Sequence, residues 1–216
     1  MTLHNLSEYN SLIGNYIREL RDIHIQNDRM RFRTNVERIG MLLAYEISRT
    51  LHYRTENVVT PLGTASSNVI ADPIVVAAVL RAALPLHNGI LHCFDHAENA
   101  FVSAYRKYTD NEHFEVHTEY IAAPQLTGKT LILCDPMLAT GTSMELAWRT
   151  LLTKGMPTHL HLASVIASRS GIDYMQHILP PDADLWVAAI DPALDAHAYI
   201  VPGLGDAGDL AFGEKE

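Results

Sequence analysis

At 216 residues, the chain is long enough for one domain with a sizeable core and at most a small appendage. Hydrophobic residues make up 48% of it and charged residues 19%, a balance typical of a packed globular protein and not of a disordered chain. Because the formal net charge is −9, we expect no general attraction to nucleic acid or to anionic membranes, so any anionic ligand must be held by a local site.

Two helices are predicted near the amino terminus, over about residues 6–51. The first carries apolar residues at helical spacing: Leu12, Tyr16, Ile17 and Leu20. The second is predicted to begin at a capping box formed by Thr34 and Glu37. An apolar stripe runs along it at Val36, Ile39, Leu43, Ile47 and Leu51.

Beyond these helices the pattern changes to short apolar runs separated by helical or loop segments. The runs read NVVTPLG, IVVAAVLRA, AFVSAYR, TLILCDP, HLHLASVIAS and DLWVAAID. Runs of this length that are rich in Val, Ile and Leu are typical of parallel strands buried on both faces. Helices are predicted between them at roughly residues 84–93, 143–154 and 171–178.

This alternation predicts an α/β fold, namely an open, mainly parallel sheet flanked by helices, in a single domain over residues 1–216. A more polar and aromatic stretch at about 105–125 is predicted to form a hairpin or flap that projects from the body.

One strand of the predicted sheet ends in an acid and a turn of small residues, within LILCDPMLATGTSMELAWRTLL at 131–152. Asp135 ends the strand, and Ala139 to Ser143 form a turn that enters a helix. Backbone N–H groups at such a helix start favour an anion, and open α/β sheets bind ligands at the carboxyl ends of their strands. A simple helix cap remains the alternative interpretation for an isolated Thr-Gly-Thr-Ser.

Two other motif matches fail in their context. The segment GLGDAG at 203–208 fits the dinucleotide pattern G-x-G-x-x-G, but only eight residues follow Gly208, too few for the helix and strand that such a site needs. The segment APQLTGKT at 123–130 resembles a degenerate P-loop, but a strand, and not a helix, is predicted after its lysine.

The segment CDPMLATGTS resembles the motif with which type I phosphoribosyltransferases bind phosphoribosyl pyrophosphate (PRPP), in the form found in uracil phosphoribosyltransferases. The resemblance implies that Asp135 faces the ribose hydroxyls and that the following loop binds the 5′-phosphate. The residues it assigns to PRPP binding here are Asp135, Met137, Leu138, Ala139, Thr140, Gly141, Thr142 and Ser143.

The carboxyl-terminal segment AYIVPGLGDAGD, residues 198–209, resembles the uracil-recognition segment of the same family. Main-chain groups of Ile200, Gly205 and Ala207 would then pair with the alternating C=O and N–H groups of uracil. The implied base-binding set is Tyr199, Ile200, Pro202, Gly205, Asp206 and Ala207. A flexible glycine-rich end without a ligand is the alternative for such a tail. The resemblance also requires this segment and the Thr-Gly turn to flank one crevice.

Two arginines match those that the family uses against pyrophosphate. Arg81 lies in VLRAALPLHNGIL, and Arg106 lies in SAYRK at the root of the predicted flap. A guanidinium fork suits phosphate oxygens. The resemblance thus implies a catalytic set of Arg81, Arg106, Asp135 and Asp206, although the sequence does not choose which acid assists deprotonation.

The implied activity is a glycosyltransferase reaction in pyrimidine salvage, in which uracil and PRPP give UMP and pyrophosphate. Mg²⁺ is the expected cofactor; it would be bound with PRPP and not by a dedicated protein site, with Asp135 as a possible ligand. The expected partners are these small molecules and a second copy of the chain in a homodimer or larger homo-oligomer. The alternatives are transfer to another base, or a non-catalytic regulatory protein that binds nucleotide or RNA, for which Ala83, Pro85 and the divergent flap are the motivation.

Neither the histidines nor the cysteines predict a metal site. Among the 12 histidines, His92 with His96 and His159 with His161 have suitable spacing, but the sequence shows no third ligand for either pair. The only cysteines are Cys93 and Cys134, which lack metal-type spacing and suit a reducing compartment. Because the amino terminus also lacks a basic stretch followed by an apolar run, we expect a cytoplasmic protein.

Overall fold

The computed structural model describes residues 1–108 and 114–214, and the side chains of residues 104–119 lie outside this description. Its main sheet has the strand order β1-β10-β9-β7-β4-β5-β6, with β8 beside β9. Every pairing in this sheet is parallel except that of β5 with β6. The strands are β1 (Thr2–Asn5), β4 (Ile74–Val79), β5 (Glu98–Tyr108), β6 (Phe114–Ala122), β7 (Thr130–Cys134), β8 (Met137–Leu138), β9 (His159–Ser168) and β10 (Asp184–Asp191). The predicted open, mainly parallel sheet is confirmed.

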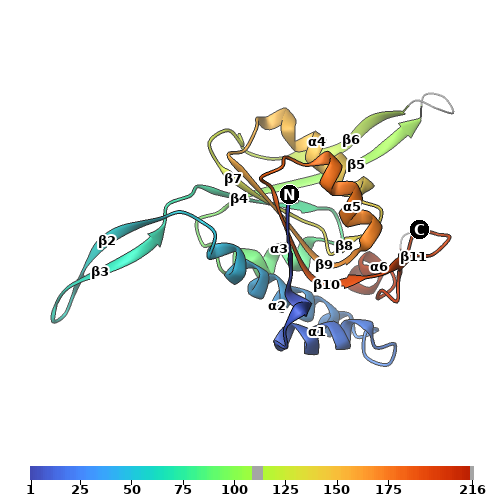
Figure 1. The fold of residues 1–216 in the computed structure, drawn as a ribbon, viewed down its shortest axis with the longest axis horizontal. Helices are drawn as coiled ribbons and strands as arrows, with labels where there is room; N and C mark the ends of the chain where they lie inside the picture. Colours follow the sequence, from blue (N-terminus) through green and yellow to red (C-terminus); the bar gives the residue numbers. More distant parts are fainter. Residues whose placement is uncertain (109–113, 215–216) are drawn as a thin grey trace.

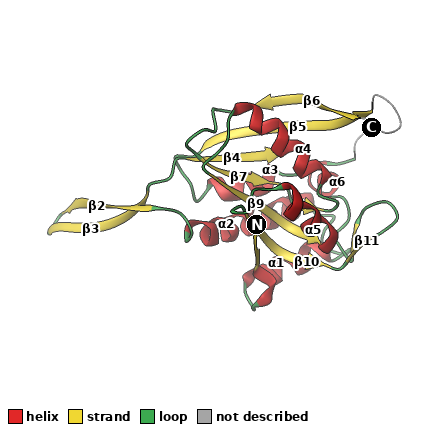
Figure 2. Cartoon of the chain, turned by 45° about the horizontal axis from the view of Figure 1, so that its top comes forward, coloured by secondary structure: helices red, strands yellow, loops and turns green. Residues whose placement is uncertain are grey.

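Helices cover both faces of this sheet (Figures 1 and 2). The helices are α1 (Leu12–Arg21), α2 (Arg29–Ser48), α3 (Leu84–Leu91), α4 (Thr142–Leu151), α5 (Arg169–Ile178) and α6 (Ala207–Phe212), with short 3₁₀ turns η1 (Leu6–Glu8) and η2 (Leu152–Lys154). Successive residues of β4 alternate between two cores, because Val76 packs with the helices α1, α2 and α3, whereas Val75 packs with α4 and α5. A strand buried on both faces is therefore apolar throughout, as the sequence suggested.

The run NVVTPLG is not a buried strand of the main sheet, so that prediction was wrong. It spans the tip of an antiparallel hairpin formed by β2 (Tyr53–Thr60) and β3 (Gly63–Ile70). Pro61 and Leu62 form its tight turn, and every residue of β2 is exposed. The hairpin extends away from the body of the molecule (Figure 1).

Two details at the amino terminus also differ from the sequence prediction. Helix α2 begins at Arg29, where the carboxylate of Asp28 accepts a hydrogen bond from the backbone N–H of Arg31 at 3.0 Å. Thr34 and Glu37 therefore lie inside the helix and form no capping box. In addition, residues 2–5 form the edge strand β1, which pairs parallel with β10 and which the sequence analysis missed because so short a segment shows no periodicity.

The predicted flap corresponds to the pairing of β5 with β6. Their antiparallel register runs from Phe101 opposite Ala122 to Tyr108 opposite Phe114. The tip, residues 109–113, lies outside the described residues. Over the described part of the chain, no helix combines the length and apolar character needed to cross a bilayer.

Candidate active site

The loop between β7 and α4 begins with Asp135 and ends with Gly141. Gly141 has a φ of +86° and is the N-cap of α4, and a Cβ atom there would lie 2.7 Å from Cδ1 of Tyr174. Glycine is therefore required both by the backbone conformation and by the space. Gly141 has no side chain to cap α4, and the hydroxyl of Thr140 accepts from the backbone N–H of Thr142 at 3.3 Å. A helix start of this kind favours an anionic ligand.

The loop is held in place by the start of α5. Ser168 donates a hydrogen bond from its hydroxyl to the carbonyl of Ala139 at 2.6 Å, and Gly171 approaches so closely that a Cβ there would lie 2.3 Å from the same oxygen. The loop encloses a small hollow lined by Asp135, Met137, Leu138, Ala139, Thr140, Gly141, Ser143 and Met144. Of the predicted PRPP-binding residues in this segment, Thr142 alone does not line that hollow; its hydroxyl instead accepts a hydrogen bond from the hydroxyl of Thr140 at 3.1 Å.

Asp135 is the titratable group of this hollow. Burial raises the pKa of its carboxyl to about 7, although the backbone N–H of Met137 opposes the shift by donating to it at 3.2 Å. A carboxylate in this position gains stability from any hydroxyl donor or cation that enters the hollow. Asp135 is thus suited to binding sugar hydroxyls or a metal-bearing substrate.

Arg81 follows β4 and reaches the carboxyl-terminal segment. Its Nη2 donates to the carbonyl of Gly213 at 3.2 Å and lies 3.5 Å from Oδ1 of Asp209. Its buried Nε has no hydrogen-bond partner among the described residues, which leaves a donor for an anionic ligand. Ala83 has a φ of −75°, so the turn after Arg81 requires no glycine there, and Pro85 lies in the first turn of α3, where proline is tolerated.

The carboxyl-terminal segment curls beside Arg81. It consists of a short strand β12 (Ile200–Val201), which pairs with β11 (Ala193–Leu194), a cis peptide before Pro202, and the helix α6, whose N-cap is Asp206. Ile200 is buried, whereas Pro202 is exposed. Tyr199, Asp206 and Ala207 line a second hollow, together with Leu80, Arg81, Ala82, Met137 and Gly208. Gly205 lies beyond it, in a third hollow that also includes Asp206.

Met137 belongs to the walls of both the loop hollow and the Arg81 hollow, so the two hollows adjoin. Three segments far apart in the sequence thus meet at one place, which is the arrangement required by the sequence interpretation. Arg106 lies in β5 with its backbone opposite Val116, but its side chain lies outside the described residues.

The sequence analysis missed the residues that hold the carboxyl-terminal segment in place. Asp191, which ends β10, accepts two hydrogen bonds from Arg21, at 2.8 and 2.9 Å, and one from the backbone N–H of Gly203 at 3.1 Å. Arg21 also donates to the carbonyl of Gly203 at 3.1 Å, and Arg33 donates to that of Ala211 at 2.7 Å. The sequence did contain a signal for Asp191, because the run DLWVAAID ends in an acid just as the run TLILCD ends in Asp135.

The family model for uracil phosphoribosyltransferase matches residues 10–214. A uracil phosphoribosyltransferase from Porphyromonas gingivalis is 55% identical over 215 residues, with all of both chains covered. Another from Methanothermobacter thermautotrophicus is 41% identical over 184 residues, covering 84% of this chain and 83% of the relative.

Solved structures give the same picture of the fold. The AQ2163 protein of Aquifex aeolicus superposes with a TM-score of 0.85 at 28% identity, with 98% of both chains covered. A hypoxanthine phosphoribosyltransferase from Staphylococcus aureus superposes with a TM-score of 0.50 at 14% identity, covering 86% of this chain and 83% of the other. At that identity the likeness concerns the fold alone.

Proposed function

This chain belongs to the uracil phosphoribosyltransferase family, and we propose that it joins uracil to the ribose phosphate of PRPP, forming UMP and releasing pyrophosphate in pyrimidine salvage. A ring nitrogen of uracil attacks the anomeric carbon of PRPP as the bond to pyrophosphate breaks. Because the anomeric carbon carries positive charge in the transition state, catalysis depends on positioning the reactants and on stabilising the departing anion.

The observation that carries this proposal is the wall shared between the loop hollow and the Arg81 hollow at Met137. Asp135 would hold the ribose hydroxyls, and the loop from Met137 to Ser143 would wrap the 5′-phosphate. Arg81, with its unpaired buried Nε, would hold the pyrophosphate, and Arg106 would join it from the flap. Each of these roles follows from the family motif and the chemistry of the side chain.

Uracil would lie against the carboxyl-terminal segment. Tyr199, Ile200 and Pro202 would form the wall of its pocket. Main-chain groups of Gly205 and Ala207 would form hydrogen bonds with the edge of the base, and Asp206 would lie near the ribose or base. Cytosine carries an amine in place of one uracil carbonyl, so a main-chain N–H that donates to this carbonyl would face another donor, a mismatch that costs about 1–3 kcal/mol.

Mg²⁺ fits this site as a partner of the substrate. The described lining of the loop hollow includes one carboxylate, Asp135. Its pKa is raised by burial, so a nearby cation would stabilise its charged form. One carboxylate plus substrate oxygens is an ordinary Mg²⁺ environment, and the ion when bound neutralises charge on pyrophosphate.

The proposal also covers the domain organisation, assembly and location of the protein. We expect a single domain over residues 1–216 that assembles as a homodimer or larger homo-oligomer, and a cytoplasmic location is consistent with two free thiols, Cys93 and Cys134. The non-catalytic alternative loses part of its motivation, because Ala83 and Pro85 both suit the conformation around them.

The test is an assay of the purified chain with Mg²⁺, PRPP and a panel of free bases. We expect UMP and pyrophosphate with uracil and little turnover with cytosine, hypoxanthine or adenine. Arg81→Ala should lower the rate by roughly ten- to a hundredfold, because a hydrogen bond to a charged group contributes about 1.5–3 kcal/mol. Folded protein that binds PRPP but forms no UMP would support the non-catalytic alternative, and turnover of another base would correct the substrate.

A further inference from the structure

A cluster of histidines around Asp184 lies at the amino ends of β9 and β10. His159 and Asp184 are the first residues of their strands, whereas Asp135 follows the carboxyl end of β7. Since all three strands are parallel, the cluster and the candidate active site lie at opposite ends of the sheet. The cluster is therefore separate from the site described above.

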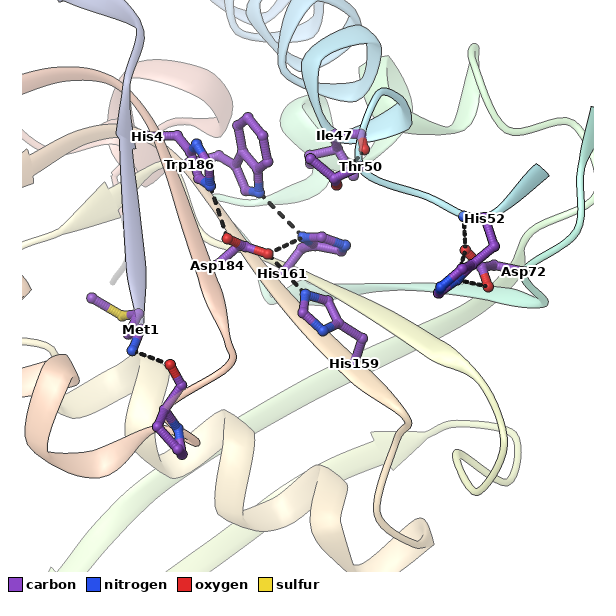
Figure 3. A network of polar contacts seen from close by, with 11 residues as sticks. Met1, His4, Ile47, Thr50, His52, Asp72, His159, His161, Asp184 and Trp186 are labelled. Carbon is purple, nitrogen blue, oxygen red and sulfur yellow. Dashed lines mark hydrogen bonds and ion pairs between the residues drawn. The ribbon is translucent and has the colours of Figure 1, made fainter.

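Strand register brings these side chains together. Asp184 is opposite His161, His4 is opposite Trp186, and side chains of residues two apart share a face. Figure 3 shows His4 from β1 and His159 and His161 from β9 converging on the carboxylate of Asp184, which begins β10. His4 lies 2.8 Å from Oδ1 of that carboxylate, and Nε2 of His159 lies 2.8 Å from Oδ2. Asp184 and His4 are the partners of the His159–His161 pair that sequence spacing alone could not supply.

One contact in the cluster favours a cation. Trp186 can only donate through its indole N–H, and Nδ1 of His161 lies 3.2 Å from that nitrogen. Nδ1 is therefore an acceptor and carries no proton. Oδ2 of Asp184 lies 3.6 Å from the same Nδ1, so two atoms with lone pairs face each other without a proton of His161 between them.

Imidazole nitrogen and carboxylate oxygen are also the donors that zinc takes in proteins. Donors about 2.1 Å from a tetrahedral ion lie about 3.4 Å apart, and the 2.8 and 3.6 Å separations around Oδ2 bracket that value. The ligand atoms of His159, His161 and Asp184 all lie within 4.8 Å of one another.

We propose that His159, His161 and Asp184 bind one divalent transition-metal ion such as Zn²⁺, with His4 holding the other oxygen of Asp184 in place. Binding displaces the proton that His159 shares with Asp184. The Nδ1 lone pair of His161 passes from the indole N–H of Trp186 to the ion, so this hydrogen bond breaks as the metal–nitrogen bond forms, and a fourth position is left for water. His159 is about one third exposed, which gives the ion a route from solvent. The ion ties β9 to β10 and, through His4, to the edge strand β1. Mg²⁺, which prefers oxygen ligands, is a poor occupant.

The test is a titration of chelator-treated protein with ZnCl₂ in competition with a chromogenic chelator, together with thermal melting. We expect one equivalent to bind and the melting temperature to rise with Zn²⁺ but not with Mg²⁺. His159→Gln and Asp184→Asn should each weaken binding at least roughly a hundredfold, and His4→Gln should weaken it about tenfold, as for partners that orient a ligand.

His92→Gln is the matched control, because His92 also pairs with a carboxylate, lying 3.4 Å from Glu37, which belongs to α2 and not to the cluster. The affinity of this variant for Zn²⁺ should match that of the unaltered protein. UMP formation, which does not depend on this site, should persist in every variant and thereby shows that each is folded. Absence of stoichiometric binding, or equal binding by His159→Gln, Asp184→Asn and the control, would overturn the proposal.

Discussion

Burial of Asp135 disfavours the charged form of its carboxyl group. The raised pKa of about 7 means that the folded protein keeps a proton which the unfolded chain loses near pH 4. The contribution of Asp135 to stability is therefore fully present below about pH 4 and declines as the pH rises through about 7. Activity at neutral pH thus draws on a carboxylate that the fold alone does not favour.

We predict that Asp135→Asn stabilises the free protein more at pH 8 than at pH 4.5. The difference in free energy of unfolding between the variant and the unaltered protein should be at least about 1.4 kcal/mol larger at pH 8 than at pH 4.5, the equivalent of one pKa unit. Urea unfolding at both pH values measures it. The same variant should lose roughly ten- to a hundredfold in the rate of UMP formation, since the hydrogen bonds to ribose hydroxyls are weakened. A pH-independent difference in stability would show that Asp135 is ionised throughout this range.

Gly141 gives a second test at the scale of one residue. Gly141→Ala places a methyl group 2.7 Å from the ring of Tyr174 at a φ of +86°. We predict a KM for PRPP raised at least about fivefold, from a distortion costing about 1–3 kcal/mol, with a smaller change in KM for uracil. Gly128→Ala is the control, because Gly128 has a similar φ of +80° but open space around it. An equal increase in the KM for PRPP in both variants would mean that backbone strain alone, and not the contact with Tyr174, causes the change.

Elements differed in how far the sequence could predict them. Strands such as β4 and β7 were identified because burial on both faces makes every residue apolar, and α3, α4 and α5 were placed to within a few residues. The hairpin β2–β3 was misassigned because Val58 and Val59 suit a buried strand equally well, and only tertiary structure leaves them exposed. The loops of the candidate site were predictable from local motifs. The Arg21–Asp191 pair joins residues 170 positions apart, so although the acid at the end of DLWVAAID is a local signal, nothing local identifies Arg21 as its partner.

The contact between α1, β10 and the carboxyl-terminal segment holds in place the residues that we propose bind the base. Arg21→Lys keeps the charge but loses the fork that binds Asp191 and the carbonyl of Gly203 together. We predict a KM for uracil raised about five- to tenfold, equivalent to about 1–1.4 kcal/mol, with a smaller change in KM for PRPP. Steady-state kinetics with each substrate varied in turn measures both constants.

Arg18→Lys is the matched control for this prediction. It lies on the same helix, but its side chain is mostly exposed and its nearest carboxylates lie 3.8 and 3.9 Å away. Kinetics unchanged in Arg21→Lys, or changed equally in Arg18→Lys, would contradict a role for Arg21 in positioning the base segment.

At the scale of the whole molecule, the parallel sheet separates two kinds of chemistry. Its carboxyl ends carry Asp135, the loop proposed to bind phosphate and the segment proposed to bind the base, while its amino ends carry the histidine cluster. Because rigid strands join the two ends, the proposed metal ion at one end would stabilise the strands whose other ends position the candidate site. β10 shows this directly, since it begins at Asp184 and ends at Asp191.

The hairpin β2–β3 is the part of the molecule that the single chain leaves unsupported. A two-stranded hairpin is marginally stable by itself in water, yet this one projects from the body with Val59 and Leu62 almost fully exposed (Figure 1). Packing against a second copy of the chain would bury these apolar side chains, each of which contributes about 1.5–3 kcal/mol when fully buried. We therefore predict a homo-oligomer in solution, measured by light scattering coupled to gel filtration.

The double substitution Val59→Ser with Leu62→Ser should shift this assembly towards the monomer at a given protein concentration, because it removes apolar area from the proposed contact while leaving the main sheet untouched. Leu12→Ser with Met30→Ser is the matched control, since both residues are well exposed but lie on α1 and α2. A monomeric unaltered protein would contradict the prediction. An oligomer that survives the hairpin substitutions but dissociates with the control would move the interface to the amino-terminal helices.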